Sequence, residues 1–126
     1  MSTIKVDTIQ DISGVVKPLP QVTCQINGIT TTTIVGSVGV SSITDESTGV
    51  TTVSFSNAFG DAAYTSTTAA GQGAASAGSG ARWSSLGAGA SYGGTVYTTS
   101  QVRLLTVYAT ANVVDVQYSM LTCIST

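Results

Sequence analysis

Apolar residues recur at every second position in one short run of this chain after another, and this spacing restricts the possible folds more than any other feature of the sequence. Residues 113–124 show this best, and the residues that share one side there are Val114, Val116, Tyr118, Met120, Thr122 and Ile124. Asp115, Gln117 and Ser119 alternate with them. A period of two predicts a β-strand, whose successive side chains point to opposite faces. No run has the apolar spacing of a helix longer than one turn, so the sequence predicts an all-β protein.

Turn signals divide the rest of the chain into further short strands. Asn27-Gly28 follows an alternating run and predicts a tight turn, and residues 40–56 hold two alternating runs around the polar stretch 45–49, which predicts a β-hairpin. Strands are also expected within 62–70 and 102–109. Ser and Thr are abundant and 14 residues are Gly, a composition that favours short strands joined by turns. We expect one domain, built as a small antiparallel β-sandwich or as a trimeric interlocked β-structure.

The first 20 residues form a separate unit in this prediction. Residues 4–12 alternate with one flaw, which predicts an extended strand at the start of the chain. A secretory signal peptide needs an unbroken apolar core of roughly 7–15 residues, and charged or amide side chains interrupt every apolar run here. Pro18 and Pro20 exclude a helix and favour extended backbone before them. We therefore divide the chain into an N-terminal strand with a linker, 1–20, and a β-rich module, 21–126.

Charge is scarce, and this excludes several classes of function. The net charge is −2, and the four cationic residues are spread along the chain, whereas a phosphate backbone needs a clustered basic patch. No apolar run approaches the roughly 18 residues of a membrane-spanning helix. The chain has no histidine, which argues against the common zinc sites and the histidine-dependent catalytic triads. We expect no nucleic-acid partner, no membrane span, no metal, no cofactor and no enzymatic activity.

The two cysteines, Cys24 and Cys123, admit two interpretations. A disulfide between them would close a long loop and stabilise the fold by restricting the unfolded chain. Alternatively, both are small buried side chains that behave as apolar residues. The sequence leaves both possibilities open.

Residues 71–94 are rich in Gly and Ala, and we predict a flexible loop there. A loop longer than about 15 residues is uncommon in a compact domain and is often functional. This one holds the only tryptophan, Trp83, beside Arg82, with Tyr92 further on. Aromatic rings stack on sugar rings and a guanidinium donates hydrogen bonds to hydroxyls, so Arg82, Trp83 and Tyr92 are candidates for a surface or glycan contact. The alternative for the aromatic residues, Tyr64 and Tyr97 included, is packing in a core or a subunit interface.

Large apolar side chains are few, which bears on assembly. Two Phe, one Trp and five Tyr supply the large aromatic surface, while many other side chains are small. Burial contributes about 25 cal/mol per Å², so a lone monomer of this composition is expected to be marginal. We predict an obligate homo-oligomer, or a subunit of a larger shell, with strands added across chain boundaries.

Two stretches resemble tail-fibre-like virion structural proteins of tailed phages that infect marine cyanobacteria. One is MSTIKVDTIQDISG at 1–14, and the other is VSSITDESTGVTTVSFSNAFGDAAYTSTTAA at 40–70, with Asn27-Gly28 upstream of it. Together they cover less than half of the chain, and the Gly/Ala-rich segment is not part of the resemblance. The resemblance implies an N-terminal attachment element and a displayed C-terminal module. The residues that would then dock on a partner are Ile4, Val6, Ile9 and Ile12.

The resemblance implies a phage virion structural protein, a short tail-fibre or head-fibre subunit that contacts the host surface. Its expected partners are further copies of itself, with a trimer favoured, other virion proteins of the capsid, neck or tail, and a host-surface glycan. The expected location is the virion, assembled in the host cytoplasm. The first alternative is a capsid decoration (cement) protein, and the second is a secreted carbohydrate-binding module.

Overall fold

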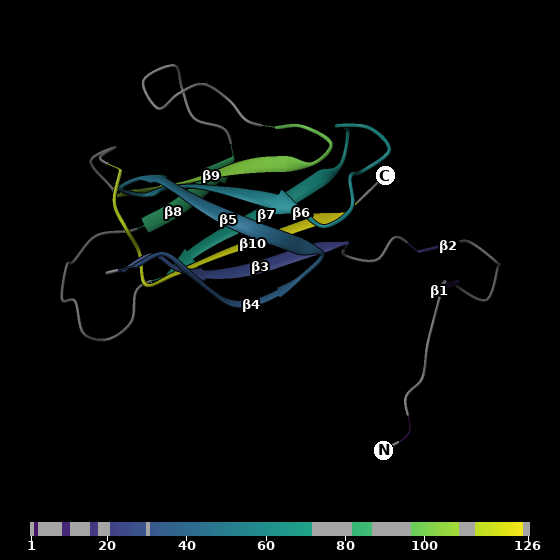
Figure 1. Cartoon of the computed structure of the whole chain (residues 1–126), viewed down its shortest axis with the longest axis horizontal. Coiled ribbons are helices and arrows are strands. Elements are labelled where there is room, and N and C mark those ends of the chain that lie inside the picture. Colours follow the sequence, from purple (N-terminus) through teal and green to yellow (C-terminus); the bar gives the residue numbers. More distant parts are fainter. Residues whose placement is uncertain are drawn as a thin grey trace.

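The computed structural model describes residue 2 and the ranges 9–10, 16–17, 21–29, 31–71, 82–86, 97–108 and 113–124. In these ranges every regular element is a β-strand, which confirms the all-β prediction. Eight of the strands form two four-stranded antiparallel sheets that lie against each other as a small sandwich (Figure 1). The trimeric arrangement stays a prediction.

We name the two sheets by their charge. The neutral sheet has the order β4–β3–β10–β7 and contains no Asp, Glu, Lys or Arg; its strands are β4 (Thr33–Val38), β3 (Val22–Asn27), β10 (Tyr118–Ile124) and β7 (Thr65–Gly71). The charged sheet has the order β5–β6–β9–β8, with the strands β5 (Val40–Ser47), β6 (Val50–Phe55), β9 (Gln101–Tyr108) and β8 (Arg82–Leu86). Asp45, Glu46, Arg82 and Arg103 all lie on this second sheet.

The core lies between the two sheets. The neutral sheet contributes the inward residues of β3 and β10, and the charged sheet contributes those of β6 and β9, so the two central pairs of strands supply most of the buried surface. The core residues on these strands are Val22, Cys24, Ile26, Val53, Phe55, Val102, Leu104, Leu121 and Cys123. Along β3 the alternation of buried and half-buried residues is regular, as its period-two sequence predicts.

β10 buries the less apolar of its two sequence faces. The strand starts at Tyr118, so it is shorter than the alternating run 113–124 predicts. Tyr118 and Met120 do share a face, but that face is exposed, whereas Leu121 and Cys123 point into the core. The alternation within the strand is therefore correct, but it puts Tyr118 and Met120 on the outside of the sandwich, while Val116, before the strand, is buried.

The predicted hairpin within 40–56 is confirmed, with a tighter turn than expected. β5 and β6 pair antiparallel around Thr48-Gly49, and Asp45 and Glu46 lie in β5 and not in the turn. Gly49 is buried and has a φ of 67°. Its N–H donates to Asp115 Oδ1 at 2.6 Å, and its carbonyl accepts from the Thr106 N–H at 2.8 Å. The turn is thus fastened to β9 and to the segment before β10.

Gly39 makes the passage from the neutral sheet to the charged sheet. It is the single residue between β4 and β5, and its φ is 69°. A Cβ at this position would lie 2.1 Å from the carbonyl oxygen of Gln21, a backbone atom. Only glycine fits this conformation and this contact, so the bend that joins the two sheets depends on residue 39.

The prediction of a loop at 71–94 needs correction, while the strand expected at 4–12 stays a prediction. Part of the Gly/Ala-rich segment is not a loop, because Arg82–Leu86 forms β8 and pairs with β9, while residues 72–81 and 87–94 lie outside the described residues. At the start of the chain, Ile9–Gln10 (β1) pairs with Val16–Lys17 (β2), a short ladder that Figure 1 draws apart from the sandwich. The rest of the expected strand at 4–12 lies outside the described residues.

The structure decides between the two interpretations of the cysteines, because both are free and buried. In the β3–β10 register Cys24 lies opposite Leu121, and Cys123 lies opposite Val22. The two cysteines are therefore diagonal neighbours, which places their Cα atoms about 7–8 Å apart, beyond the usual span of a disulfide. They act as apolar core residues.

Burial of the two thiols makes the stability depend on pH in the alkaline range. Desolvation raises the pKa of Cys24 and of Cys123 to about 11 from an ordinary value of 9.0. Between pH 9 and 11 the unfolded chain releases protons that the folded chain keeps, so the free energy of unfolding should fall as the pH rises through this window. Urea titrations at several pH values should show a shallower fall for Cys24→Ala than for the parent, and equal slopes would contradict this assignment.

Candidate functional site

The outer face of the neutral sheet is the most unusual surface among the described residues. Its exposed side chains are uncharged, and several are large and apolar: Val38 is 61% exposed, Met120 51% and Tyr118 38%, while Val35, 55% exposed, lies at the bulge of the edge strand β4. Soluble monomers rarely leave such side chains in one patch, and a patch of this kind usually marks an interaction site. A surface of this composition is suited to bind another macromolecule face to face.

Small residues leave two shallow hollows on this face, and Met120 lies between them. One hollow, of about 240 Å³, is lined by Thr23, Gln25 and Gly36 together with Met120. The other, of about 160 Å³, is lined by Ala69, Ala70, Gly71 and Tyr118, again with Met120. The face therefore has both a protruding side chain and depressions into which a side chain of a partner fits.

The edge strands of the two sheets differ in how they are protected. All six residues of β4 are exposed, and none is charged. The neighbouring edge β5 carries Asp45 and Glu46 and has two shifts of register against β6. Charged side chains and bulges are the usual means by which a protein prevents pairing at a sheet edge. The charged sheet has both along β5, while β4 has one bulge and no charge.

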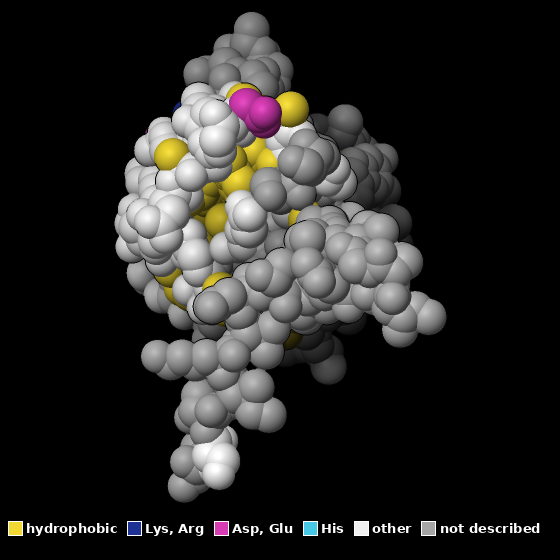
Figure 2. Space-filling model, turned by 90° about the vertical axis from the view of Figure 1, so that its right-hand side faces the viewer, with side chains coloured by type: hydrophobic (Ala, Val, Ile, Leu, Met, Phe, Trp, Pro, Cys, Tyr) yellow, Lys and Arg dark blue, Asp and Glu magenta, His cyan; other side chains and the backbone are white. Residues whose placement is uncertain are grey.

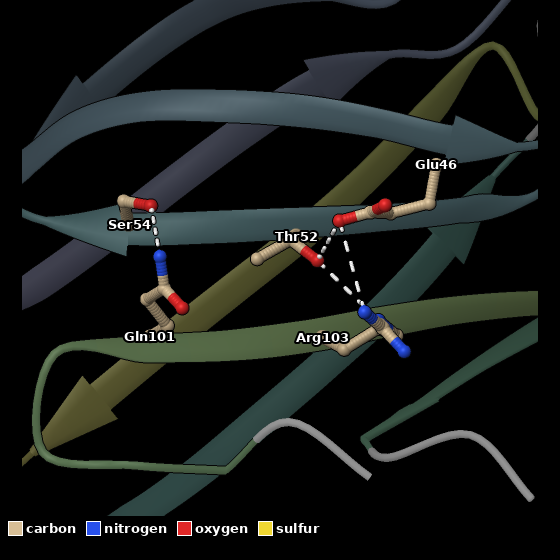
Figure 3. A network of polar contacts seen from close by, with 5 residues as sticks. All are labelled: Glu46, Thr52, Ser54, Gln101 and Arg103. Carbon is tan, nitrogen blue, oxygen red and sulfur yellow. Dashed lines mark hydrogen bonds and ion pairs between the residues drawn. The ribbon is translucent and has the colours of Figure 1, made fainter. Parts of the chain in front are cut away.

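The outer face of the charged sheet carries a polar network (Figure 3). Thr52 Oγ1 donates to Glu46 Oε1 at 2.9 Å and accepts from Arg103 Nε at 3.3 Å, and Arg103 Nη2 lies 3.7 Å from Glu46 Oε1. Next to it, Gln101 Nε2 donates to Ser54 Oγ at 3.1 Å. Because Thr52 and Arg103 are buried, this network satisfies polar groups that water does not reach.

Thr52 is the link in this network, and its loss should be measurable. Thr52→Val keeps the shape of the side chain but removes the acceptor of the Arg103 Nε–H and the donor to Glu46. We therefore expect the free energy of unfolding to fall by about 1–3 kcal/mol. Ser54→Ala, two residues along the same face, changes an exposed hydrogen bond and should stay within about 0.5 kcal/mol of the parent. Urea denaturation compares the two variants, and equal losses would contradict a structural role for Thr52.

Four aromatic side chains pack at one end of the core. The Phe59 and Tyr64 rings stack with centroids 4.4 Å apart, and Tyr64 and Tyr97 stack at 4.5 Å, while Phe55 meets Phe59 and Tyr64 edge to face. The Tyr97 hydroxyl donates to the Tyr64 carbonyl oxygen at 2.5 Å. Burial raises the pKa of Tyr64 above its ordinary range. Of the two alternatives for Tyr64 and Tyr97, packing is therefore the one that the structure shows.

Figure 2 shows the same sandwich from the end at which β3 begins and β6 ends, with hydrophobic side chains visible in a recess. A depression of about 360 Å³ there is lined by Gln21, Val22, Gly39, Asn57 and Ala58. Its lining has no charged side chain and no nucleophile, so it lacks the groups that would anchor a charged ligand or perform a reaction.

The residues predicted for docking and for glycan contact are only partly placed. Ile9 lies in β1 opposite Lys17, and Arg82 and Trp83 lie in β8 opposite Tyr108 and Val107, where the backbone alone is described. Ile4, Val6, Ile12 and Tyr92 lie outside the described residues. The side chains of these seven residues lie outside what the structure describes, and their roles stay predictions.

Sequence reasoning missed the neutral sheet face. Its strands come from residues 22–38, 65–71 and 118–124, and only the fold places them side by side. The one signal available was the lack of charged residues in each of these stretches. That lack becomes meaningful only when the stretches are known to form one sheet.

In the described part of the chain, no three Cys, Asp or Glu side chains gather closely enough to bind a metal ion. The same residues include no helix of the length and hydropathy that a membrane span requires. Comparison of the chain with protein-family models, with curated proteins and with solved structures gives no match.

Proposed function

We propose that this chain is a structural subunit of a phage virion, a short tail-fibre or head-fibre subunit that functions as a homo-oligomer without catalytic activity. The observation that carries the proposal is the division of charge between the sheets: one sheet has none, and it exposes Val35, Val38, Tyr118 and Met120. A protein that works as a free monomer in solution gains nothing from such a face, whereas a subunit of an assembly covers it.

The position of the resembling stretch in the fold supports the same proposal. The stretch 40–70 supplies β5, β6 and most of β7, and its aromatic residues Phe55, Phe59 and Tyr64 pack together in the core. The likeness to fibre modules thus falls on residues that determine the fold of the module. The N-terminal stretch 1–14 is the proposed attachment element.

We place the host-facing surface on the charged sheet. Arg82 and Trp83 lie in its edge strand β8, away from the neutral sheet's free edge at β4. If they contact a host glycan, Trp83→Ala should lower adsorption of the particle while the number of copies per particle stays the same. Unchanged adsorption would remove Trp83 from the glycan contact.

The copy number in purified virions tests the proposed function. Quantitative mass spectrometry should find a few to some tens of copies per particle if the chain is a fibre or appendage subunit. Hundreds of copies would contradict the fibre role and favour the decoration role. Absence from the particle would contradict both and favour a secreted binding module.

A further inference from the structure

The outer face of the neutral sheet has the composition of the centre of a protein–protein interface. Such centres are depleted of charged residues and enriched in Tyr and Met. Here Tyr118 and Met120 lie in β10, with Thr, Ala, Val and Gly residues around them and no charged residue on any of the four strands. The face is therefore suited to become fully buried.

The lack of charge also restricts the partner. A charged surface placed on this face would lose water without gaining a counter-charge, which is unfavourable. The partner must therefore be as neutral as the face itself. Among the described residues of this chain, the surface that meets this condition is the same face of another copy, because Asp45, Glu46 and Arg103 lie on the other sheet.

The shape of the face is compatible with self-association. Met120 protrudes and is 51% exposed, and a hollow lies on each side of it, one next to Gly36 and one next to Ala69. When two such faces meet, Met120 of one copy can enter a hollow of the other. Because each copy has both the protruding side chain and the hollow, the hollows can be filled by a second copy of the same chain.

The area of the face determines what else the contact must include. Four strands of six or seven residues cover a projected area of about 400 Å², from about 4.8 Å between strands and about 3.3 Å per residue. A stable interface buries about 800 Å² on each partner. The outer face, with β4 already counted, is too small, so the contact must continue around the free edge of β4, where Ile34 and Val35 are also exposed.

From these observations we infer that the outer face of the neutral sheet, together with the free edge of β4, is the surface through which copies of this chain pack against one another. This inference rests on the proposed function, because it identifies the surface through which the proposed virion subunit would assemble. It assigns the central contact to Met120 and the contact at the edge to Val38.

The test uses variants of the full chain that each carry one added negative charge, on the neutral sheet or on the charged sheet. Met120→Glu and Val38→Glu place it on exposed positions of the neutral sheet, and Ser42→Glu places it on an exposed position of β5 as the control. Light scattering and sedimentation equilibrium should show at least tenfold weaker association for the first two variants and unchanged association for Ser42→Glu. Circular dichroism and urea denaturation check that each variant is folded.

Association of Met120→Glu and Val38→Glu with the affinity of the parent would overturn the inference, as would a parent that is monomeric at about 100 µM. A monomeric parent whose Met120→Glu variant fails to enter virions would mean that another virion protein covers the face. Whatever the association measurement gives, the copy number in virions tests the proposed function separately. Failure of this inference and failure of the proposed function are therefore distinguishable.

Discussion

Gly49→Ala is expected to destabilise the folded chain by at least about 3 kcal/mol. The φ of 67° costs an L-residue about 1–2 kcal/mol. A Cβ would also lie 2.6 Å from the Val114 carbonyl oxygen and 2.7 Å from its nitrogen, and these are backbone atoms that must move apart. The movement would loosen the hydrogen bonds from Gly49 to Asp115 and from Thr106 to Gly49. Urea denaturation measures the loss.

Gly60→Ala is the matched control for this variant. Gly60 has no atom within 4 Å of an added Cβ, and its φ is not in the left-handed region. We expect its free energy of unfolding to stay within about 0.5 kcal/mol of the parent. If Gly49→Ala were as mild as Gly60→Ala, the fastening of the β5–β6 turn to the segment before β10 would be wrong.

Leu121→Ala should destabilise the monomer much more than Met120→Ala does. Leu121 is 1% exposed in the core, so its truncation leaves a cavity and should cost about 2–5 kcal/mol. Met120 is its chain neighbour on the outer face, and its truncation should change the stability of the monomer by less than about 0.5 kcal/mol. Denaturation at protein concentrations low enough to keep the chain monomeric compares the two.

The same pair of variants tests which face of β10 is buried. If Met120→Ala were the more destabilising of the two in the monomer, the strand would be turned by one residue and Tyr118 and Met120 would belong to the core. The neutral face would then lose its exposed apolar residues on β10, and copies of the chain would have no apolar patch there to cover.

Much of the fold could be predicted from local patterns. The alternation of Val22, Cys24 and Ile26 and the Asn27-Gly28 turn are sufficient to predict β3 and its end, and the Asn27 side chain accepts a hydrogen bond from the Ile29 N–H in that turn. The hairpin of β5 and β6 follows from the runs that flank a glycine. These features depend on neighbouring residues, which is why a sequence reveals them.

What could not be predicted depends on distant residues. The sequence does not indicate which face of β10 is buried, because Tyr118, Met120 and Ile124 outnumber Leu121 and Cys123 as apolar candidates, and only the partners β3 and β7 decide it. β8 was missed because Gly and Ala surround Arg82–Leu86, and its pairing with β9 outweighs that composition. The neutral face likewise exists only once four separate stretches pair.

If this chain covers its neutral sheet with copies of itself, the mass of the parent protein in solution must exceed that of one chain. Multi-angle light scattering of the purified full chain over a range of concentrations should give an integer multiple of 12.6 kDa, three-fold if the resemblance holds. A single species of 12.6 kDa that stays folded and does not associate up to about 100 µM would contradict the claim.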